Sequence, residues 1–355
     1  MDSPTQDATP PQGPPPQGPP PQEILMRMLV APIVTRAIYV AAKLGIADLL
    51  HSGPQTAEQL AAATGSHAPS LYRVLRALAS VGIFAEDDEG RFTPTPLSDC
   101  LRRDVRGSVR GMALLFFGAK FHYDAWGDIL HSVQTGGTAA EHLHGVAPFE
   151  YFEQHPEDAA IFNEAMTSLS AAVGPAVVQA YDFSSFSTLV DIAGGHGNLL
   201  AAILEANPHM QGVLFDLPSV IEGAHAAIAA RGLEERCQLV AGDFFEAVPA
   251  ADGYILKNVI HDWDDERAIA ILSNIRRAMA DTGARKLLLV EFVVPPGNEP
   301  SLSKLIDLEM LLLPGGRERT EAEYRALFKA AGFELTRVVP THSPVSIVEG
   351  VPVSS

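Results

Sequence analysis

The segment from Leu189 to Leu200, LVDIAGGHGNLL, decides the fold class. An apolar, β-branched run reaches an acidic residue, and a glycine-rich loop then leads into an apolar helical segment. This order is typical of a nucleotide-binding α/β unit. A dinucleotide loop would read G-x-G-x-x-G, but position 200 is leucine, and Asp191 would repel phosphate and attract an ammonium group. The loop therefore suits a cationic ligand without phosphates.

After Ser187, short apolar runs alternate with helical segments. The alternation predicts a parallel sheet wound on both faces, with a ligand crevice at the carboxyl ends of its strands. The expected strands are 188–193, 212–216, 237–241, 253–258 and 286–292, followed by a closing hairpin of 333–339 and 344–349.

Two further strand ends carry residues that could bind an adenosine. Asp216 ends the second expected strand, where a carboxylate can accept both hydroxyl protons of a ribose; capping the turn DLPSV is its alternative role. Gly242, Asp243 and Phe244 end the third, where the acid can accept from an adenine amino group and the ring can stack on the base. The glycine loop and these two sites, in this order, favour an adenosine-containing ligand.

The first half of the chain has a helical, winged-helix pattern from Glu23 onward. Thr56 with Gln59 forms a capping-box pattern, a second helix starts near Ala68, and the segment RFTPTPL suggests a two-stranded wing. From 55 to 100 there are three arginines against six acidic residues, which speaks against DNA binding. We expect an all-α, winged-helix-like dimerisation module whose apolar first helix, 24–46, forms a homodimer.

Composition excludes several classes of protein. The 355 residues carry a formal charge of −18, which disfavours nucleic acid as a partner. The two cysteines form no C-x-x-C pair, so we expect a cytoplasmic protein without a disulfide framework. Residues 1–22 are proline-rich and predict a disordered tail; neither a secretory signal nor a membrane-spanning stretch is expected. His142 and His144 in EHLHG lack an acidic cluster with ligand spacing, so no metal is expected.

Five motifs in order resemble the S-adenosylmethionine-dependent small-molecule O-methyltransferases, which include the plant caffeic-acid and flavonoid enzymes and bacterial polyketide-tailoring enzymes. The motifs are DIAGGHG at 191–197, FDLP at 215–218, GDFF at 242–245, LKNVIHDWDDE at 256–266 and PGGRERT at 314–320. The similarity extends from about residue 23 to the end. One departure is Ala193, where the family more often has a third consecutive glycine.

The resemblance implies a Rossmann-like class I methyltransferase domain at 181–355, with a mostly parallel seven-stranded sheet and a terminal antiparallel hairpin. It also implies a dimerisation domain at 23–105 and linking helices at 106–180 that contribute to the acceptor pocket. The implied cofactor is S-adenosylmethionine, with S-adenosylhomocysteine as product. The implied cofactor-binding residues are Asp191, Gly194, Gly195, Gly197, Asp216, Leu217, Gly242, Asp243, Phe244, Lys257 and Asp262.

The chemistry of methyl transfer to a phenol requires a base beside the methyl group. His261 follows the fourth expected strand, and an imidazole with a pKa near 6.5 is a suitable base. Because a phenol has a pKa of roughly 10, complete transfer to such a base is uphill by ~5 kcal/mol. The family supplies orienting carboxylates at positions matching Glu291 and Glu318. Glu291 could instead be a salt-bridged structural acid, and Glu318 could be a solvated loop acid.

The acceptor is expected to be a flat, hydrophobic, hydroxylated aromatic ring. Phe162, Met166 and Met310 resemble the family's acceptor-pocket positions, and Trp126 and Phe149 are further candidates for substrate binding. Three alternatives stay open: N-methylation, a relative that uses the same site for decarboxylation or hydroxylation, and a metabolite-binding DNA regulator. An intact His261 with both glutamates favours O-methylation, because the other reactions need no base for a phenol.

Overall fold

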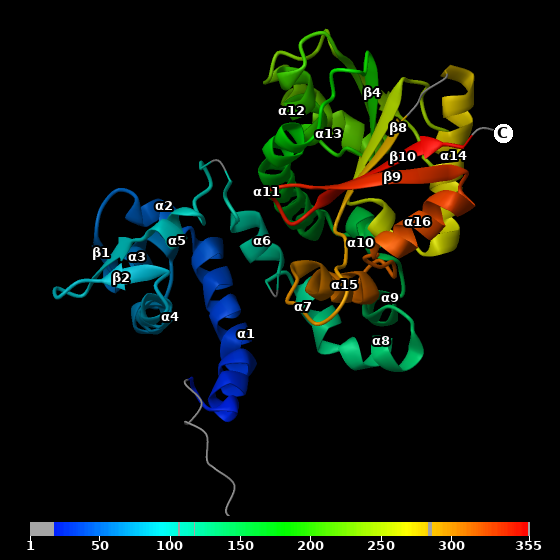
Figure 1. Ribbon diagram of the computed structural model, residues 1–355. Helices are drawn as coiled ribbons and strands as arrows, with labels where there is room; N and C mark the ends of the chain where they lie inside the picture. Colours follow the sequence, from blue (N-terminus) through cyan, green and yellow to red (C-terminus); the bar gives the residue numbers. More distant parts are fainter. Residues whose placement is uncertain (1–17, 106, 117, 283–285, 354–355) are drawn as a thin grey trace, which may run out of the picture.

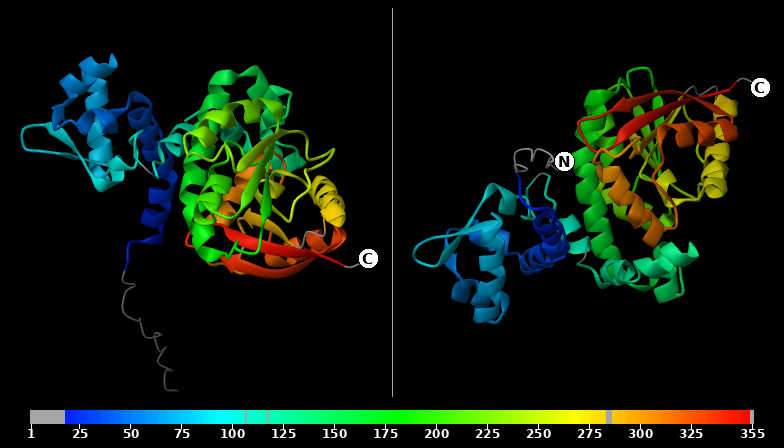
Figure 2. Two further views of the ribbon diagram at one scale, coloured as in Figure 1. Left: turned by 90° about the horizontal axis from the view of Figure 1, so that it is seen from above. Right: turned by 60° about the horizontal axis from the view of Figure 1, so that its bottom comes forward.

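The computed structural model describes residues 18–353 except 106, 117 and 283–285. A helical N-terminal module lies beside a larger α/β domain, and the two views of Figure 2 show the same separation from other sides (Figures 1 and 2). Most of the proline-rich segment expected to be disordered, residues 1–17, lies outside the described residues. The rest of it does not form a tail throughout, because the first helix already begins at Pro21.

The N-terminal module combines helices with a small antiparallel sheet of order β1-β3-β2. Thr56 and Thr95 both form complete capping boxes, so local sequence fixes two helix starts. The long first helix ends at Gly45, which adopts a left-handed conformation, so the helix expected to continue to Ile46 is in fact two. The elements are α1 (Pro21–Leu44), α2 (Ile46–Leu50), β1 (Gln55–Thr56), α3 (Ala57–Thr64), α4 (Ala68–Ser80), β2 (Phe84–Glu86), β3 (Arg91–Pro94) and α5 (Pro96–Asp99).

The exposed part of α1 is unusually apolar. Its side chains at 24–26, 28–30 and 33 are exposed, whereas Ala41 and Ala42 at its other end are buried in the core of the module. By length and composition α1 could also cross a membrane, and it is the single such helix among the described residues. This helix carries the charged residues Glu23, Arg27, Arg36 and Lys43, so it does not contradict the expectation that no stretch of membrane-spanning length is free of charge.

Helices connect the module to the α/β domain and form a layer below one end of its sheet (Figure 1). Gly111 of α6 lies so close to α11 that a Cβ there would stand 2.7 Å from the backbone oxygen of Glu164, which explains a glycine at this crossing. The elements are α6 (Arg110–Leu115), α7 (Lys120–Gly127), α8 (Ile129–Thr135), α9 (Ala139–His144), α10 (Pro148–Gln154) and α11 (Pro156–Ala180).

The seven-stranded sheet has the order β6-β5-β4-β7-β8-β10-β9, parallel except for the hairpin of β9 and β10. This confirms the expected sheet and its terminal hairpin. The strands are β4 (Thr188–Ile192), β5 (Gln211–Asp216), β6 (Cys237–Ala241), β7 (Gly253–Lys257), β8 (Lys286–Glu291), β9 (Phe333–Pro340) and β10 (Ser346–Pro352).

Alternating strand residues build one core on each face of the sheet. Leu189 and Leu214 pack with α11, α12 (Asn198–Ala206) and α13 (Pro218–Ala229), whereas Val190 and Val213 pack with α14 (Asp265–Thr282) and α16 (Glu321–Ala330). No helix is assigned in the connection 242–252, so the strand-helix repeat is interrupted after β6. A 3-10 turn, η1 (Ile260–Asp262), follows β7, and α15 (Leu302–Leu312) lies below the carboxyl end of the sheet.

Candidate active site

The carboxyl ends of β4 and β5 form a loop system that holds an acidic site. Asp216 accepts hydrogen bonds from the backbone N–H of Gly195 at 2.8 Å and of Leu217 at 2.7 Å. A Cβ at Gly194 would lie 2.7 Å from the Asp191 carboxylate, so only glycine allows the loop to pass this close to the strand end. The expected ribose acid therefore holds the glycine loop through Gly195 and, through Leu217, also caps the turn that was its alternative role.

Asp191 is buried at 1 % exposure and neither carboxylate oxygen has a hydrogen-bond partner of normal geometry among the described residues. Burial raises its pKa to about 7, although nearby Lys257 opposes the rise. Burial lowers the pKa of Lys257, against the effect of Asp191, Glu291 and Asp262. A buried acid without a partner is costly in the folded chain. A cationic ligand at this edge would lower that cost.

The end of β6 offers a place for an aromatic base. Asp243 accepts from the backbone N–H of Phe245 at 2.7 Å, and Asn274 of α14 holds the loop by donating to the carbonyl of Phe244 at 2.9 Å. The ring of Phe244 contacts Trp263 edge to face, with centroids 6.1 Å apart. Gly242 has to be glycine, because a Cβ would lie 2.5 Å from the Phe215 ring. Leu217 is 47 % exposed at the end of β5.

His261 in η1 lies within a group of three carboxylates. Its Nδ1 is 2.7 Å from Glu318 Oε1 and 3.9 Å from Glu291 Oε2, and its Nε2 is 3.5 Å from Asp262 Oδ1. Burial by itself would lower the pKa of His261, but Asp262, Glu291 and Glu318 together raise it to about 10. Burial also raises the pKa of Asp262 to about 6. The flanking carboxylates therefore favour the imidazolium form and hold the pKa of His261 above the unperturbed value near 6.5.

The two glutamates hold different positions. Glu291, at the end of β8, accepts from the backbone N–H groups of Val259 at 3.0 Å and Ile260 at 2.9 Å, so it fixes the turn that carries His261. Burial raises the pKa of Glu291. Glu318 is buried and contacts the imidazole directly, so it is not a solvated loop acid. Oε2 of each glutamate has no partner among the described residues.

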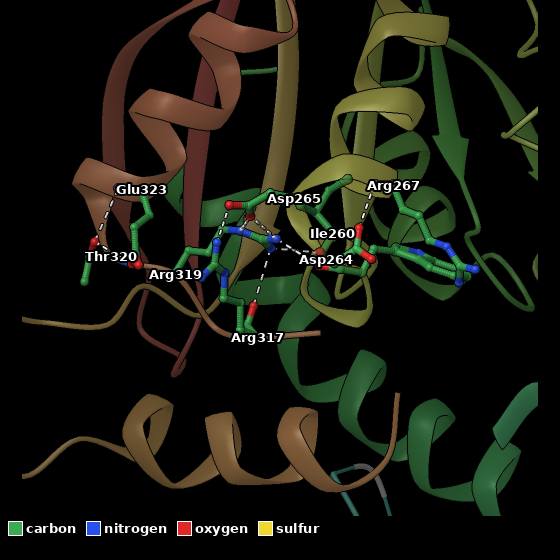
Figure 3. Close-up of polar contacts among 9 residues, drawn as sticks. Ile260, Asp264, Asp265, Arg267, Arg317, Arg319, Thr320 and Glu323 are labelled. Carbon is green, nitrogen blue, oxygen red and sulfur yellow. Dashed lines mark hydrogen bonds and ion pairs between the residues drawn. The ribbon is translucent and has the colours of Figure 1, made fainter. Parts of the chain in front are cut away.

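Arg319 holds the loop that places Glu318, and the sequence did not single it out. Its side chain is fully buried and donates to the carbonyls of Ile260 and Trp263, both at 2.9 Å, and forms an ion pair with Asp265 at 2.9 Å (Figure 3). Arg317 donates its backbone N–H to the carbonyl of His261 at 2.8 Å. In the sequence these arginines suggested a solvated loop. Their position inside the motif that carries Glu318 was the feature that could have indicated their structural role.

Further contacts hold this loop. Asp307 of α15 accepts from the backbone N–H of Glu318 at 2.8 Å. A Cβ at Gly316 would lie 2.0 Å from the backbone oxygen of His261, so the loop can pass over η1 only as glycine. The helix after the loop starts with the capping box of Thr320 and Glu323 (Figure 3). Helix start, ion pair and glycine contact together determine where Glu318 lies.

The residues expected to bind the acceptor are distributed over four helices, α7, α10, α11 and α15. Phe162 and Met166 of α11 pack with Leu115 and Ala119, while Phe149 is 45 % exposed and contacts Phe162 edge to face. Met310 is buried on α15, three residues after the aspartate that holds the Glu318 loop.

Trp126 lies in a different contact from the other acceptor candidates. Its indole N–H donates to Glu309 of α15 at 3.0 Å, and the other oxygen of Glu309 is 2.8 Å from His122 Nε2. The residue thereby links α7 to α15.

Two groups of residues have the spacing of a metal-ligand set. His261, Glu291 and Glu318 form one, and their ligand atoms lie within 4.8 Å of one another. Asp128, His131 and His142 form the other, at the surface. His144 instead stacks on Phe121. His142 has one acidic neighbour, Asp128, which precedes it by fourteen residues and which the spacing of the EHLHG motif does not reveal.

Family models match both parts of the chain. Residues 126–334 match an O-methyltransferase domain, and residues 25–104 match an O-methyltransferase dimerisation domain.

The chain belongs to the O-methyltransferase family.

This O-methyltransferase is similar to proteins that act on aromatic natural products. The phenazine O-methyltransferase PhzM of Lysobacter antibioticus is 50% identical over 93% of this chain and 96% of its own length. The mitomycin biosynthesis 6-O-methyltransferase of Streptomyces lavendulae is 41% identical over 88% and 90%. The crystal structure of LaPhzM superposes with a TM-score of 0.89 at 49% identity, covering 94% of this chain and all of that one.

The family assignment identifies the cofactor of this methyltransferase as S-adenosylmethionine. The described residues fit it: an acid that can bind ribose hydroxyls, an aromatic ring beside an acid for the base, and a buried carboxylate without a partner for a cationic group. The fold assignment and the dimerisation domain agree with those expected from the sequence motifs.

Proposed function

We propose that this O-methyltransferase methylates a phenolic hydroxyl of a planar aromatic metabolite, with His261 as the base. The observation that carries the proposal is the Glu318–His261 contact of 2.7 Å beside two further buried acids. If Nδ1 donates its proton to Glu318, Nε2 is the atom that can receive the phenol proton. Glu291 then supports the turn rather than bonding the ring.

The charges around His261 support a base whose protonation depends on the bound S-adenosylmethionine. A pKa of about 10 for His261 is close to that of a phenol, so proton transfer costs little once the imidazole is neutral. S-adenosylmethionine supplies an electrophilic methyl group on a positively charged sulfur. Positive charge beside the site would lower the pKa of His261 and that of the phenol together, so it would favour the neutral imidazole and the phenolate while the two pKa values stay close. His261 would then take the phenol proton as the oxygen accepts the methyl group, and S-adenosylhomocysteine would be the leaving group.

The proposed cofactor site follows the strand ends. Asp216 with Gly195 and Leu217 would bind the ribose, Gly242, Asp243 and Phe244 the adenine, and Lys257 the adenosine side. Asp191, Gly194 and Gly197 would lie at the amino-acid moiety, and Asp262 near the sulfur. The orphaned carboxylate of Asp191 supports this arrangement, since an ammonium group would satisfy it.

We further propose that the acceptor lies between α11 and α15, against Phe162, Met166 and Met310, with Phe149 at the rim. Trp126 would support the pocket without hydrogen-bonding the acceptor, because its indole N–H donates to Glu309. The names of the relatives, a phenazine and a mitomycin methyltransferase, support a fused aromatic acceptor.

N-methylation is the second candidate, because two relatives carry that activity in their names. The phenazine-1-carboxylate N-methyltransferase of Pseudomonas aeruginosa is 34% identical, and an aminoriboflavin N,N-dimethyltransferase of Streptomyces davaonensis is 37% identical. A nitrogen acceptor with a free lone pair needs no base. The buried group of His261, Glu291 and Glu318 therefore favours oxygen.

The test is incubation with S-adenosylmethionine and matched pairs of acceptors, hydroxyphenazines with aminophenazines and naphthols with naphthylamines, followed by mass spectrometry. Methylation of the hydroxy members supports the proposal, and methylation of only the amino members contradicts it. Binding is measured separately: S-adenosylmethionine should raise the melting temperature, NAD should not, and Asp216→Ala should remove the response.

The N-terminal module is proposed to form a homodimer in the cytoplasm. The exposed apolar side chains of α1 support this, since a monomer would leave them in water, and the matching dimerisation domain covers the same residues. A second copy of the chain fits this helix better than a bilayer does, because the C-terminal end of α1 is buried in the core of the module.

A further inference from the structure

The hairpin of α8 and α9 brings together three metal-ligating residues away from the catalytic group. Asp128 precedes α8, His131 lies in its first turn, and His142 lies in α9 after a turn through Gly136 and Gly137. Thr138 accepts the backbone N–H of Glu141 and so fixes the start of α9. The two helices are therefore held in a defined relation by their own turn and cap.

The geometry within this group is close. His142 Nδ1 is 2.7 Å from Asp128 Oδ2, and the rings of His131 and His142 stack with centroids 3.7 Å apart and planes 3° from parallel. One ligand atom from each of the three residues lies within 4.8 Å of the others. Because an imidazole lone pair lies in the ring plane, one of the two stacked rings has to turn about its χ angles before all three residues can reach one ion at bond lengths of roughly 2.0–2.2 Å.

The chemistry of the set is selective. Two imidazoles and one carboxylate match the preferences of Zn²⁺ and its neighbours Co²⁺, Ni²⁺ and Cu²⁺, whereas Mg²⁺ and Ca²⁺ require more oxygen ligands. His142 is exposed and the other two residues are partly exposed, so an ion can enter from solvent and keep water as a further ligand. Binding would replace the hydrogen bond between Asp128 Oδ2 and His142 Nδ1.

The hairpin also contacts the loop that carries Glu318. Gly315 lies against Thr138, because a Cβ at Gly315 would be 3.0 Å from Thr138 Cγ2. Thr138 is the residue that starts α9, between the two histidines in sequence. A bond between α8 and α9 would therefore stiffen a support of the Glu318 loop without contacting the reacting atoms.

We propose that Asp128, His131 and His142 form a binding site for a divalent transition metal ion of the zinc type, which clips α8 to α9. The site is structural: it lies in the helical layer and not in the group around His261. Its existence does not depend on which acceptor the enzyme methylates.

The experiment titrates tag-free, EDTA-treated full-length protein with Co²⁺ and follows the visible absorption of the bound ion, with Zn²⁺ as competitor. Wild type should bind one ion per chain and melt at a higher temperature with Zn²⁺. His131→Asn and His142→Asn should each weaken binding at least ~10-fold and remove the thermal shift. The matched control is His209→Asn, an exposed histidine outside the group, which should bind as wild type does.

A second control separates the two possible ligand sets. His261→Asn should retain the Co²⁺ signal, because that residue belongs to the other group. Loss of the signal in His261→Asn, with retention in His131→Asn and His142→Asn, would assign the ion to the catalytic group and overturn the proposal. A wild-type protein without saturable binding would overturn it as well. The apo melting temperatures of the variants, measured first, show that each is folded.

Discussion

The carboxyl edge of the sheet and helix α1 depart from ordinary packing in opposite ways. The edge buries acids with unsatisfied oxygens, since both carboxylate oxygens of Asp191 and Oε2 of Glu291 lack a hydrogen-bond partner among the described residues, whereas α1 exposes a row of large apolar side chains to water. Each departure costs free energy in the isolated chain. The kind of cost indicates the kind of partner: buried negative charge suits a small cationic ligand, and an exposed apolar helix suits another protein surface.

The largest expected effect of a substitution is at α1. Leu29→Glu combined with Ile33→Glu places two charges where we expect a buried dimer interface, so self-association should weaken at least ~100-fold, as measured by light scattering over a dilution series. The matched control is Leu130→Glu with Val133→Glu, two equally exposed apolar residues of α8. Dissociation by the control pair, or an intact dimer in the α1 variant, would contradict the proposed interface. Removal of residues 1–20, which end before α1, should leave the dimer unchanged.

The catalytic half of the edge is tested by His261→Ala. Removal of the base should lower turnover by ~10²–10⁴-fold while the affinity for S-adenosylmethionine changes little. The defect should shrink for acceptors whose phenol is already ionised at the assay pH. Turnover on acceptors of graded pKa and calorimetric binding give the two readouts. Wild-type turnover on a phenol of high pKa would leave positioning of the substrate as the source of catalysis.

The two buried glutamates are expected to have different effects, because Glu318 contacts the imidazole and Glu291 holds the backbone turn. Glu318→Gln should lower turnover by ~10–100-fold, since it removes the charge bonded to the imidazole, with a small effect on stability. Glu291→Ala should instead lower the free energy of unfolding by ~1–3 kcal/mol, because the N–H groups of Val259 and Ile260 lose their acceptor. Glu291→Gln is the milder variant and should affect turnover less than Glu318→Gln. The reverse order would show that Glu291 closes its 3.9 Å gap to His261 in the working complex.

The pH dependence of cofactor affinity tests whether the sulfonium controls His261. The imidazole, with its pKa raised to about 10, is protonated at pH 7 and loses its proton as the pH rises through 10. Because a sulfonium repels imidazolium, S-adenosylmethionine should bind more tightly as the pH increases from 7 to 10, by up to ~10-fold for each unit by which it lowers that pKa. S-adenosylhomocysteine has a neutral sulfur and should lack this trend. His261→Ala should abolish the difference between the two ligands.

Sequence periodicity and motifs were enough to predict the sheet, its hairpin and the cofactor edge. Strand ends are determined locally by apolar runs, and parallel strands bring their carboxyl ends to one edge, so Asp216 and Asp243 could be placed in advance. Glu318 was assigned only by resemblance, because its burial depends on Arg319 and on Gly316 crossing η1, contacts between distant parts of the chain. The group of Asp128, His131 and His142 was missed for a related reason: His142 lies in α9, whereas the other two lie at the start of α8, and the EHLHG motif drew attention to His144.

The smallest expected effect comes from Ala193, the position where the family more often has glycine. Its φ is 54°, in the left-handed region that costs an L-residue with a Cβ roughly 1 kcal/mol. Ala193→Gly should remove that strain, partly offset by the greater entropy of the unfolded chain, for a net gain of about 0.5 kcal/mol in the free energy of unfolding. Ala226→Gly, at an exposed position inside α13, is the control and should cost ~1 kcal/mol instead. Denaturant titration of both variants tests the opposite signs. A loss of stability in Ala193→Gly would show that the methyl group contributes more through its packing beside the sheet than it costs through the backbone.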